Sequence, residues 1–382
     1  MKKRKILYIS GTRADYGLMR ETLFSIKKHP KLNIELVVTG MHLMPEFGRT
    51  IKEVKRDGFR IHEIKALYKK DDKESMASFI GKFLGLLANR IKKIKPDMVL
   101  LLGDRGEMLA GAIAGAYLTI PVAHIHGGEV TTTVDEFARH AITKLSHLHF
   151  AATQKGAERI IKMGENPWRV FKVGAPGLDG IFNQKLFSKK EIAQKYRLDL
   201  SKPILMVLQH PVTVEAEEAG KQIKETMEAV KELSYQTIVI YPNADTGGRK
   251  MIKVIEKYRK YSFIQIHKNI SHKDYLSLMK VANVLIGNSS SGIIETSSFH
   301  LPAVDIGQRQ EGRERAENII DVGYNMAKIK TAIKKAIYGK KFRKKVEKCK
   351  NHYGDGRTAE RIVSILSKIK IDKKLLDKKI AY

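Results

Sequence analysis

Acidic and histidine side chains follow several apolar, β-branched runs of the sequence. Asp104 comes directly after the apolar run 98–103, and a carboxylate beside such a wall can have a raised pKa that suits general acid or base catalysis. A second group follows it, consisting of His126, Glu129, Asp135 and His140. Asp135, or its neighbour Glu136, lies at helical spacing from His140, which places a carboxylate and an imidazole on one helix face. These residue types predict proton-transfer chemistry.

Other interpretations of this group remain open. Asp104 could instead cap the helix expected from about Gly106, because aspartate is a favoured N-cap residue. The histidines could suggest a metal, but His124 and His126 alternate along an expected strand and should face opposite sides of it. One of the two is therefore expected to be a packed core residue, and the sequence predicts no metal site.

A glycine- and serine-rich loop predicts phosphate binding. The segment Gly287-Asn-Ser-Ser-Ser-Gly292 follows an apolar run, and its glycines permit a tight turn whose N–H groups and hydroxyls can hold an anion. A plain capping turn is the alternative, since serine is a favoured N-cap. The loop matches neither the P-loop nor the G-x-G-x-x-G pattern, so ATP hydrolysis and nicotinamide chemistry lack their usual motifs.

Three arginines also stand after apolar runs, namely Arg13, Arg105 and Arg309. A guanidinium grips a phosphate through a fixed fork of donors, so arginines at strand ends suit a diphosphate that is held from two domains. A surface salt bridge is the alternative role for each of them.

The elements that must position these residues alternate between short apolar runs and longer helical patterns. Continuously apolar runs predict strands buried on both faces, and hence parallel sheets with helices on either side. A first series of expected strands comprises 6–10, 34–39, 98–103, 122–126, 149–152 and 170–173. The expected helices among them are 18–28, 73–93, 107–118 and 135–146. A second series of expected strands comprises 204–208, 237–241, 263–266, 284–286 and 303–306.

The sequence therefore predicts an α/β protein with two doubly wound, Rossmann-like domains that face a cleft. The first domain is expected over 1–173, with the carboxylates, and the second over 204–360, with the phosphate-binding loop; 174–203 is a connector. Residues 361–382 are expected to form a basic helix that packs back on the first domain. Sheets of this kind bind ligands outside the carboxyl ends of their strands, and the polar clusters stand there.

Composition excludes several classes of protein. The 382 residues include 71 Lys and Arg against 41 Asp and Glu, a formal charge of +30, and 43% hydrophobic residues, which excludes a disordered chain. One cysteine excludes an internal disulfide framework. From position 328 to 382 there are 19 basic against 5 acidic residues, a pattern we interpret as a solvated face, with no specific nucleic-acid partner. Neither a signal peptide nor a membrane span is predicted, so a soluble, cytoplasmic protein is expected.

Taken together, the motifs resemble one family, the hydrolysing UDP-N-acetylglucosamine 2-epimerases, including the branch that supplies sialic and legionaminic acid precursors. The resemblance covers about residues 5–365 and rests on a specific set of segments: 10–17 (SGTRADYG), 38–42 (VTGMH), 103–105 (GDR), 124–129 (HIHGGE), 133–140 (TVDEFARH), 144–147 (KLSH), 209–211 (QHP), 241–247 (YPNADTG), 287–292 (GNSSSG), 307–310 (GQRQ) and 353–356 (YGDG).

This resemblance implies the two-domain fold of the GT-B glycosyltransferases and a reaction without metal or cofactor. A base would remove the proton at sugar C-2 while the anomeric C–O bond breaks, which gives a 2-acetamidoglucal and UDP. Water would then add to the glycal, so that UDP-N-acetylglucosamine yields free N-acetylmannosamine. A homodimer would be usual for the family.

Carried over position by position, the resemblance assigns catalytic roles to Asp104 and Asp135. The third catalytic position is often glutamate and is His126 here, so either His126 or Glu129 takes that role. Substrate contacts fall on His42 and His140. Nucleotide contacts fall on Arg13, Arg105, His210, Asn243, Ser289, Ser290, Glu295 and Arg309.

Several alternative functions stay open. The same reaction on a UDP- or GDP-linked 2,4-diacetamido-trideoxy sugar is the first. A non-hydrolysing 2-epimerase would retain UDP on the sugar, but that branch usually has Gly-Thr-Arg-Pro-Glu where this chain has Gly11-Thr-Arg-Ala-Asp15. A glycosyltransferase would need an acceptor. A non-catalytic sugar-nucleotide binder is disfavoured because both aspartates are present, and an RNA-associated protein would bind in a salt-dependent way.

Overall fold

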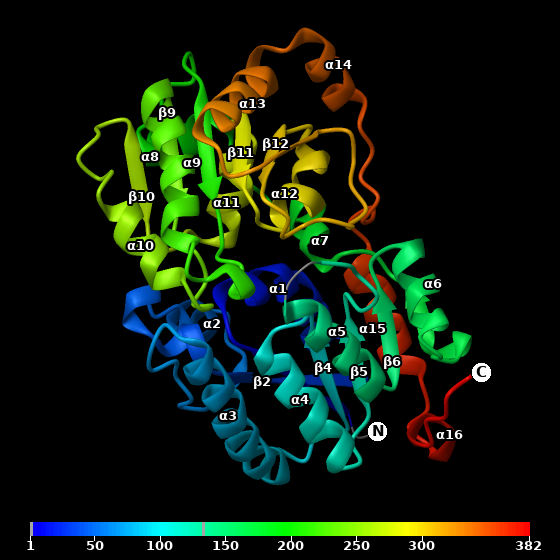
Figure 1. Ribbon diagram of the computed structural model, residues 1–382. Helices are drawn as coiled ribbons and strands as arrows, with labels where there is room; N and C mark the ends of the chain where they lie inside the picture. The colour runs from blue at the N-terminus through cyan, green and yellow to red at the C-terminus, as the bar shows by residue number, and fades with distance from the viewer. Residues whose placement is uncertain (1–2, 132–133) are drawn as a thin grey trace.

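The computed structural model describes residues 3–131 and 134–382, and shows two parallel β-sheets with helices on both faces (Figure 1). The first sheet has the strand order β3-β2-β1-β4-β5-β6-β7. Its strands are β1 (Arg4–Ser10), β2 (Leu32–Val38), β3 (Arg60–Glu63), β4 (Met98–Leu102), β5 (Val122–Ile125), β6 (Leu148–Ala151) and β7 (Val170–Lys172). All of its pairings are parallel, so every carboxyl end lies at one edge.

The second sheet repeats this topology in the other half of the chain, with the order β10-β9-β8-β11-β12-β13. Its strands are β8 (Ile204–Leu208), β9 (Gln236–Ile240), β10 (Ile264–His267), β11 (Val284–Gly287), β12 (Ala303–Ile306) and β13 (Ile319–Val322). These pairings are parallel too. The α/β, doubly wound architecture predicted from the sequence is confirmed.

The central strand of the first sheet shows why helices cover both faces. Ile6 and Tyr8 of β1 are buried against one group of helices, and Leu7 and Ile9 are buried against another. The helices of this half are α1 (Arg13–Lys28), α2 (Ile51–Arg56), α3 (Lys73–Ile94), α4 (Gly106–Tyr117), α5 (Val134–Leu145) and α6 (Gln154–Lys162). Two helices then lead across to the second half, α7 (Pro176–Asn183) and α8 (Lys189–Tyr196).

The second sheet is covered in the same way. Its helices are α9 (Ala219–Leu233), α10 (Gly248–Glu256), α11 (His272–Met279), α12 (Ser291–Ile294), α13 (Met326–Tyr338) and α14 (Lys340–Lys348). Leu205 and Val207 of β8 are buried in one core cluster, and Ile204 and Met206 in the other. Short 3₁₀ segments lie at 40–43, 45–47, 167–169, 213–215 and 296–299.

The last helices of the chain return to the first half, as Figure 1 shows at its red end. Ile362 and Leu366 of α15 (Thr358–Lys368) and Leu375 of α16 (Lys373–Leu376) belong to the core of the first sheet. Arg4 donates to the carbonyl oxygens of Leu366 and Ile369. These contacts place α15 and α16, two helices where one was predicted, against the first sheet.

The tail also contacts the helix that carries Asp135. The Lys378 ammonium donates to the carbonyl oxygens of Thr143 at 3.0 Å and of Lys144 and Ser146 at 2.7 Å, around the end of α5. It also lies 2.8 Å from Glu165. A cation at a helix C-terminus satisfies carbonyl groups that have no intrahelical partner, so the tail fixes this end of α5.

A loop of the first domain contacts the start of α10 in the second domain and holds the two halves together there. The Asp71 carboxylate accepts from the backbone N–H groups of Gly247 at 2.8 Å, Arg249 at 3.1 Å and Lys250 at 3.3 Å. Arg249 forms an ion pair with Glu46 at 2.7 Å. One domain thereby supplies the N-terminal cap for a helix of the other.

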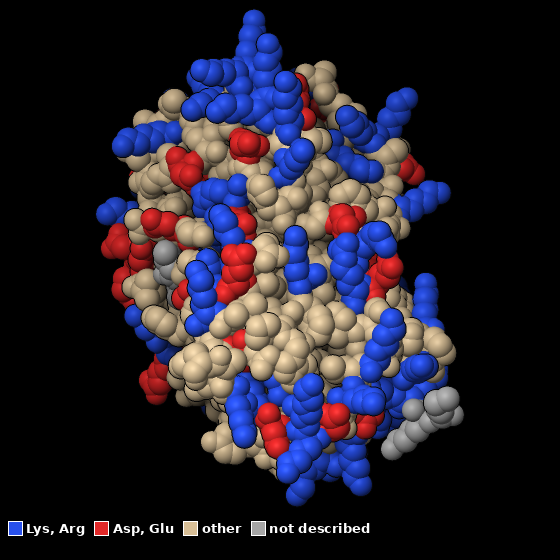
Figure 2. Space-filling model, turned by 90° about the vertical axis from the view of Figure 1, so that its right-hand side faces the viewer, with Lys and Arg blue, Asp and Glu red and all other residues tan. Residues whose placement is uncertain are grey.

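A group of positively charged side chains gathers at one end of the molecule. Figure 2 shows Lys and Arg side chains crowded at the end of the molecule that α13 and α14 form. Of the part of the chain that the structure describes, no helix is long and apolar enough to cross a membrane.

Candidate active site

The polar clusters predicted after strands gather at the carboxyl edges of the two sheets, where the domains face each other. Three ion pairs join the two domains there and hold the two sheet edges facing each other. They join Arg105 to Asp245 at 3.2 Å, Arg309 to Asp135 at 3.4 Å, and Arg313 to Glu129 at 3.5 Å. Residues from both halves therefore contribute to one site.

Asp104 follows β4 and is held by Arg139 of α5. The Nε atom of Arg139 donates to Oδ2 of Asp104 at 3.1 Å, and its Nη2 atom donates to the same oxygen. Burial alone would raise the pKa of Asp104, but Arg139 outweighs burial and lowers the pKa to about 2. Arg105, and not Asp104, is the N-cap residue of α4. Asp104 is thus a permanently ionised carboxylate directed at the cleft by Arg139.

Asp135 lies in the first turn of α5 and has the opposite electrostatic character. Burial, and after it the negative charge of Asp104, raises the pKa of Asp135 to about 6. The Arg309 guanidinium, 3.4 Å away in the second domain, acts against this rise. Two aspartates whose pKa values are driven apart in one site are what acid–base chemistry near neutral pH needs.

His126 and Glu129 lie side by side after β5. The Nδ1 atom of His126 is 3.7 Å from Oε1 of Glu129. His126 has a φ of +66°, a left-handed conformation that is uncommon for a residue with a Cβ and that is often found at functional sites. Although burial opposes it, the charge of Arg313 lowers the pKa of Glu129, which is therefore ionised. The structure brings both candidates for the third catalytic role together.

His124, two residues earlier, is a buried structural residue. Its Nε2 atom is 2.8 Å from the carbonyl oxygen of Gly103. Burial lowers the pKa of His124 to about 3, so the ring is neutral. This matches the expectation that one of the two strand histidines is part of the core, and it fixes the backbone directly before Asp104.

His140 is linked to Asp104 through two intermediate side chains. Its Nε2 atom lies 2.8 Å from Oε1 of Glu136, and the other oxygen of Glu136 accepts from Arg139 at 2.8 Å. Arg139 in turn holds Asp104. His140 is 30% exposed and stands at the outer end of this chain of contacts.

His42 lies inside the first domain. It is fully buried, and its two ring nitrogens lie 2.9 Å from the Ser10 hydroxyl and 2.8 Å from the Thr50 hydroxyl. Ser10 in turn donates to Asp15, whose carboxylate accepts from the backbone N–H groups of Gly11 and Thr12. Because both ring nitrogens have partners inside the domain, His42 supports the loop after β1 and does not itself face the cleft. This position differs from the predicted substrate contact.

That loop also explains why α1 begins earlier than the sequence pattern predicts. Thr12 is the N-cap residue and forms a reciprocal capping box with Asp15. Arg13 is therefore the first residue of α1, half-buried. Burial lowers the pKa of its guanidinium, and the charges that act on it come from Glu53 in the first domain and Asp274 in the second, so Arg13 lies where the two domains meet.

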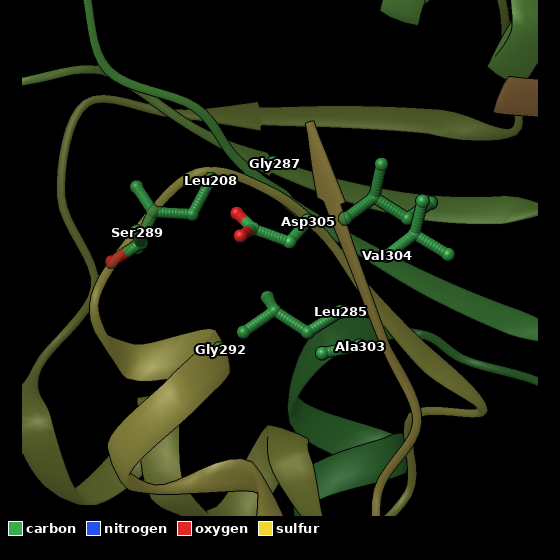
Figure 3. Close-up of a pocket in the computed structure, with 9 residues that line it drawn as sticks. Leu208, Leu285, Gly287, Ser289, Gly292, Ala303, Val304 and Asp305 are labelled. Carbon is green, nitrogen blue, oxygen red and sulfur yellow. The ribbon is translucent and has the colours of Figure 1, made fainter. Parts of the chain in front are cut away.

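The glycine- and serine-rich loop follows β11 in the second domain. Gly287 has a φ of +133°, and a Cβ there would come within 2.1 Å of the Leu208 carbonyl oxygen, so only glycine permits the turn. Ser289 and Ser290 come next and are partly exposed. Beneath the loop Figure 3 shows the Asp305 carboxylate directed toward Leu208 and Ser289, in a cavity of about 10 Å³. Burial raises the pKa of Asp305 to about 7.

Asn288 in this loop connects three of the predicted nucleotide-binding segments. Its side chain exchanges two hydrogen bonds with the backbone of His210, at 2.7 and 2.9 Å. Its carbonyl oxygen accepts from Arg309 at 3.3 Å and from Gln310 at 2.8 Å. The Nδ1 atom of His210 accepts from the backbone N–H of Asn243 at 3.1 Å. Ser, His, Asn and Arg side chains from four loops therefore form one wall.

Proton transfer is not the natural role of this wall. Burial, together with the charges of Arg309 and Arg105, holds the pKa of His210 well below its usual value, so the ring is neutral. Glu295 is buried, with Oε1 3.8 Å from Nε2 of His272, and neither atom hydrogen-bonds to another residue that the structure describes. Such a carboxylate oxygen can accept a ligand hydroxyl.

Arg105 contacts residues of both domains at the site. Its guanidinium lies 3.3 Å from Glu107, 3.2 Å from Asp245 and 3.2 Å from the Tyr68 hydroxyl. Asp245 also accepts from the Asn243 amide. The side chain is thereby positioned at the junction of the two predicted halves of the site.

Sequence reasoning did not assign a role to Arg139, Asp245, Asn288 or Arg313. The spacing of Arg139 from Asp135 on one helix was a signal that could have indicated the first of these. Asp245 and Arg313 pair with residues of the other domain, and Asn288 joins loops that are far apart in the chain, so no local spacing indicates their roles. Thr133, which begins the motif of α5, lies outside the described residues. Over residues 3–131 and 134–382, no three His, Cys, Asp or Glu side chains are grouped so that they could hold a metal ion.

Comparisons with known proteins agree with this architecture. The family model described as UDP-N-acetylglucosamine 2-epimerase matches residues 25–367. A UDP-N,N'-diacetylbacillosamine 2-epimerase (hydrolyzing) from Legionella pneumophila is 42% identical over 99% of this chain and 100% of its own length. A UDP-N-acetylglucosamine 2-epimerase from Neisseria meningitidis is 37% identical over 89% of each chain.

A solved structure shows the same fold at lower sequence identity. The crystal structure of UDP-GlcNAc 2-epimerase from Neisseria meningitidis bound to UDP-GlcNAc superposes with a TM-score of 0.80 at 19% identity, and it covers 96% of this chain and 100% of that one. The resemblance carried by the motifs is thereby confirmed over almost the whole chain. This chain belongs to the UDP-N-acetylglucosamine 2-epimerase family.

Proposed function

We propose that this protein is a hydrolysing nucleotide-sugar 2-epimerase. The observation that carries the proposal is the pair Asp104 and Asp135, whose pKa values lie at about 2 and about 6 on one wall of the interdomain site. A wall of hydroxyl, amide and guanidinium groups stands opposite. One wall is suited to move a proton and the other to hold a diphosphate.

The substrates of the relatives guide the choice of sugar. UDP-N-acetylglucosamine is the first candidate substrate. The diacetamido sugar named for the Legionella relative is the second, and the 42% identity to that relative over 99% of this chain supports it. Either would supply the free 2-epimer from which an N-acylated acidic sugar, such as sialic or legionaminic acid, is built.

The reaction consists of an elimination and a hydration. A carboxylate takes the C-2 proton as the anomeric C–O bond breaks. The electron pair of the C–O bond leaves with the nucleoside diphosphate. Water then adds across the C-1–C-2 double bond, with the new C-2 proton on the opposite face. The net reaction converts nucleotide sugar and water into nucleoside diphosphate and the free 2-epimer.

We assign proton transfer at C-2 to Asp135, because a pKa near the working pH favours proton exchange. Asp104, ionised and held by Arg139, raises the pKa of Asp135 through its charge and orients the substrate. His126 or Glu129 supplies the third group, which exchanges a proton on the other face of the ring. Ser289, Ser290 and Arg309 hold the diphosphate.

The remaining nucleotide contacts follow from the same wall. Arg13, Arg105, His210 and Asn243 border the diphosphate, and Glu295 accepts the ribose hydroxyls. His140 and His42 support the site indirectly. We also propose a cytoplasmic homodimer, on the resemblance to the family, and sedimentation of the purified protein tests the assembly.

The test is proton NMR in D₂O with UDP-N-acetylglucosamine and, separately, UDP-N,N'-diacetylbacillosamine. Release of UDP together with a free 2-epimer carrying deuterium at C-2 is the expected result. A product that retains UDP would assign the protein to non-hydrolysing epimerisation. Solvent deuterium absent from C-2 would contradict an elimination mechanism.

A further inference from the structure

A second cavity lies beside Glu129, between the two domains. Its volume is about 210 Å³, many times the roughly 10–15 Å³ that one ordered water molecule requires. Gly128 and Arg159 line it from the first domain, and Arg313 lines it from the second. Lys155 lines it too and is exposed, so the cavity lies next to bulk solvent.

The walls of the cavity are fixed by specific contacts. Gly128 has a φ of +74°, and a Cβ there would meet the Gly156 carbonyl oxygen at 2.2 Å. Arg159 donates to the Gly128 carbonyl oxygen. On the other side the Tyr353 hydroxyl donates to the Glu314 carbonyl oxygen at 2.8 Å. A space that is bounded in this way is preformed, as ligand sites usually are.

Arg313 is the residue that points to an occupant of the cavity. Its side chain is only 8% exposed, and its Nε and Nη1 atoms hydrogen-bond to no residue in the described part of the chain. Its ion pair with Oε2 of Glu129 is long, at 3.5 Å. Buried donors without acceptors are costly and uncommon, so an oxygen acceptor is expected beside them.

The charges around the cavity restrict the chemistry of that occupant. Lys155, Arg159 and Arg313 line it together with Glu129 and Glu314, so the two signs nearly balance. The carboxylates disfavour a phosphate, whereas water both accepts and donates hydrogen bonds. An ordered water needs about two to four polar partners, and the donors of Arg313 with the carboxylate of Glu129 supply them.

The position of the cavity relates this water to the reaction. Oε1 of Glu129 is 3.7 Å from Nδ1 of His126, and Oε2 is 3.5 Å from Nη1 of Arg313. Arg313 stands four residues after Arg309, whose guanidinium is 3.4 Å from Asp135. Glu129 therefore joins the cavity to the catalytic group of residues, at the end of the site where C-1 and C-2 of the sugar react.

The cavity is also separate from the nucleotide wall. Among the described residues that line it, none belongs to the set proposed to hold the nucleotide. After the elimination the diphosphate still occupies the serine-rich loop, so the water for the second half of the reaction needs a different approach to C-1. The cavity offers one that begins at the solvent beside Lys155 and ends at Glu129.

We propose that this cavity supplies the water that adds to the glycal, with Glu129 as the group that accepts the proton of that water and Arg313 as the residue that positions both. The inference rests on the proposed function and deepens it, because it gives the two candidates for the third catalytic role different tasks. Glu129 serves C-1, and His126 serves C-2.

The protons and electrons of this step balance. The water oxygen forms a bond to C-1, and one water proton passes to Glu129. The electron pair of the C-1–C-2 double bond takes a proton at C-2 from the protonated form of His126. Glu129 then returns the water proton to His126, directly or through one water of the cavity. The proton that Asp135 removed during elimination leaves to the solvent, so all three side chains are restored.

The test separates hydration from elimination. The protein is given the nucleotide sugar that the wild type turns over, and proton NMR measures UDP, free glycal and free 2-epimer together. The wild type should release UDP and 2-epimer in equal amounts. Glu129→Gln should still release UDP, but with the glycal as the main sugar product. Its hydration of supplied glycal in the presence of UDP should fall by roughly 10²–10⁴, the range for loss of acid–base catalysis.

Arg313 should affect the same ratio through its contacts with Glu129 and the water. Arg313→Met should raise the ratio of glycal to 2-epimer about tenfold, the effect of one lost hydrogen bond to a charged group. Arg313→Lys, which retains the charge, should restore part of the wild-type ratio. Glu311→Gln, an exposed change in the same loop, is the matched control and should release no glycal. Inhibition by UDP should stay the same in all variants.

A variant that fills the space gives an independent result. Val130 also lines the cavity, so Val130→Met should raise the ratio of glycal to 2-epimer, whereas Val214→Met, the same change at a valine that is 64% exposed, should not. A parallel fall of UDP and 2-epimer without any glycal in the Glu129, Arg313 and Val130 variants would overturn the inference and leave the proposed function standing. A wild-type protein that releases no UDP would contradict the proposed function, and this inference with it.

Discussion

The two halves of this protein share one strand topology but present different chemistry at their facing edges. Each sheet has its first strand inside, its second and third strands on one side, and its remaining strands in sequence order on the other; there are four of these in the first sheet and three in the second. After the strands of the first sheet stand Asp104, Asp135 and Glu129, whose pKa values are all displaced by burial and neighbouring charge. After those of the second stand serines, an asparagine and a neutral histidine. The fold provides the positions, and the residues placed there decide which half moves protons.

The largest effect on kcat should come from changes to Asp104 and Asp135 on the first-domain side of the site. Asp104→Asn and Asp135→Asn each remove a negative charge and keep nearly the same shape, so kcat should fall by roughly 10²–10⁴, the range for loss of acid–base catalysis. Calorimetry should show UDP binding within about threefold of wild type, because loss of this wall leaves the other intact. A loss of UDP binding that matches the loss of kcat would erase the distinction between the walls.

The pH profile is the second test of the same wall. Because Asp135 must be ionised to accept a proton, kcat/KM should fall roughly tenfold per pH unit below about 6 and level off above it. Asp104, with a pKa of about 2, remains ionised throughout that range. Arg309 lowers the pKa of Asp135, so Arg309→Met should move the midpoint to higher pH. A midpoint unchanged in this variant would mean that another group titrates.

Changes in the other wall should act on binding. Ser289→Ala and Ser290→Ala each remove one hydroxyl that we propose meets the diphosphate, so KM and the inhibition constant of UDP should rise about five- to tenfold, as for a hydrogen bond to a charged group. Their kcat values should change much less than those of the aspartate variants. Ser298→Ala, outside the loop, serves as a control. A fall in kcat alone would contradict a binding role.

The smallest effect is expected where one domain caps a helix of the other. Asp71→Ala removes the acceptor for three N–H groups at the start of α10, a change worth about 1 kcal/mol for a typical N-cap. The two domains should be held together less firmly, so KM should rise about two- to fivefold, and small-angle scattering should show a larger radius of gyration. Lys70→Ala is the neighbouring control. An unaltered radius would mean that other contacts hold the domains together.

Patterns in the sequence predicted every described strand except β3 and β13, and the predicted strands include the partly buried edge strand β7. Ile204–Leu208 and Ala303–Ile306 were predicted to the residue. β3 and β13 lie at the edges of their sheets and are only partly buried, so neither shows a continuous apolar run. The start of α1 was missed because its capping box places charged residues in the first turn.

For the site, residue types at strand ends predicted which segments meet, but not how they pair. The contacts of Arg139 with Asp104 and of Arg309 with Asp135 join residues 35 and 174 positions apart, and no local pattern encodes such a distance. His42 illustrates the same limit, since its motif does not reveal that both ring nitrogens are engaged inside the domain.

The return of α15 and α16 to the first sheet has a consequence for biosynthesis. Ile362, Val363, Leu366 and Leu375 complete a core whose other buried members lie before residue 174, and a whole second domain separates the two sets in the chain. At the usual rate of about 5–20 residues per second, a ribosome would deliver these helices roughly ten to forty seconds after the first domain has emerged. Throughout that interval one face of α1 stays uncovered. The first domain should therefore complete its core only after α15 and α16 have been synthesised, which is after the whole second domain.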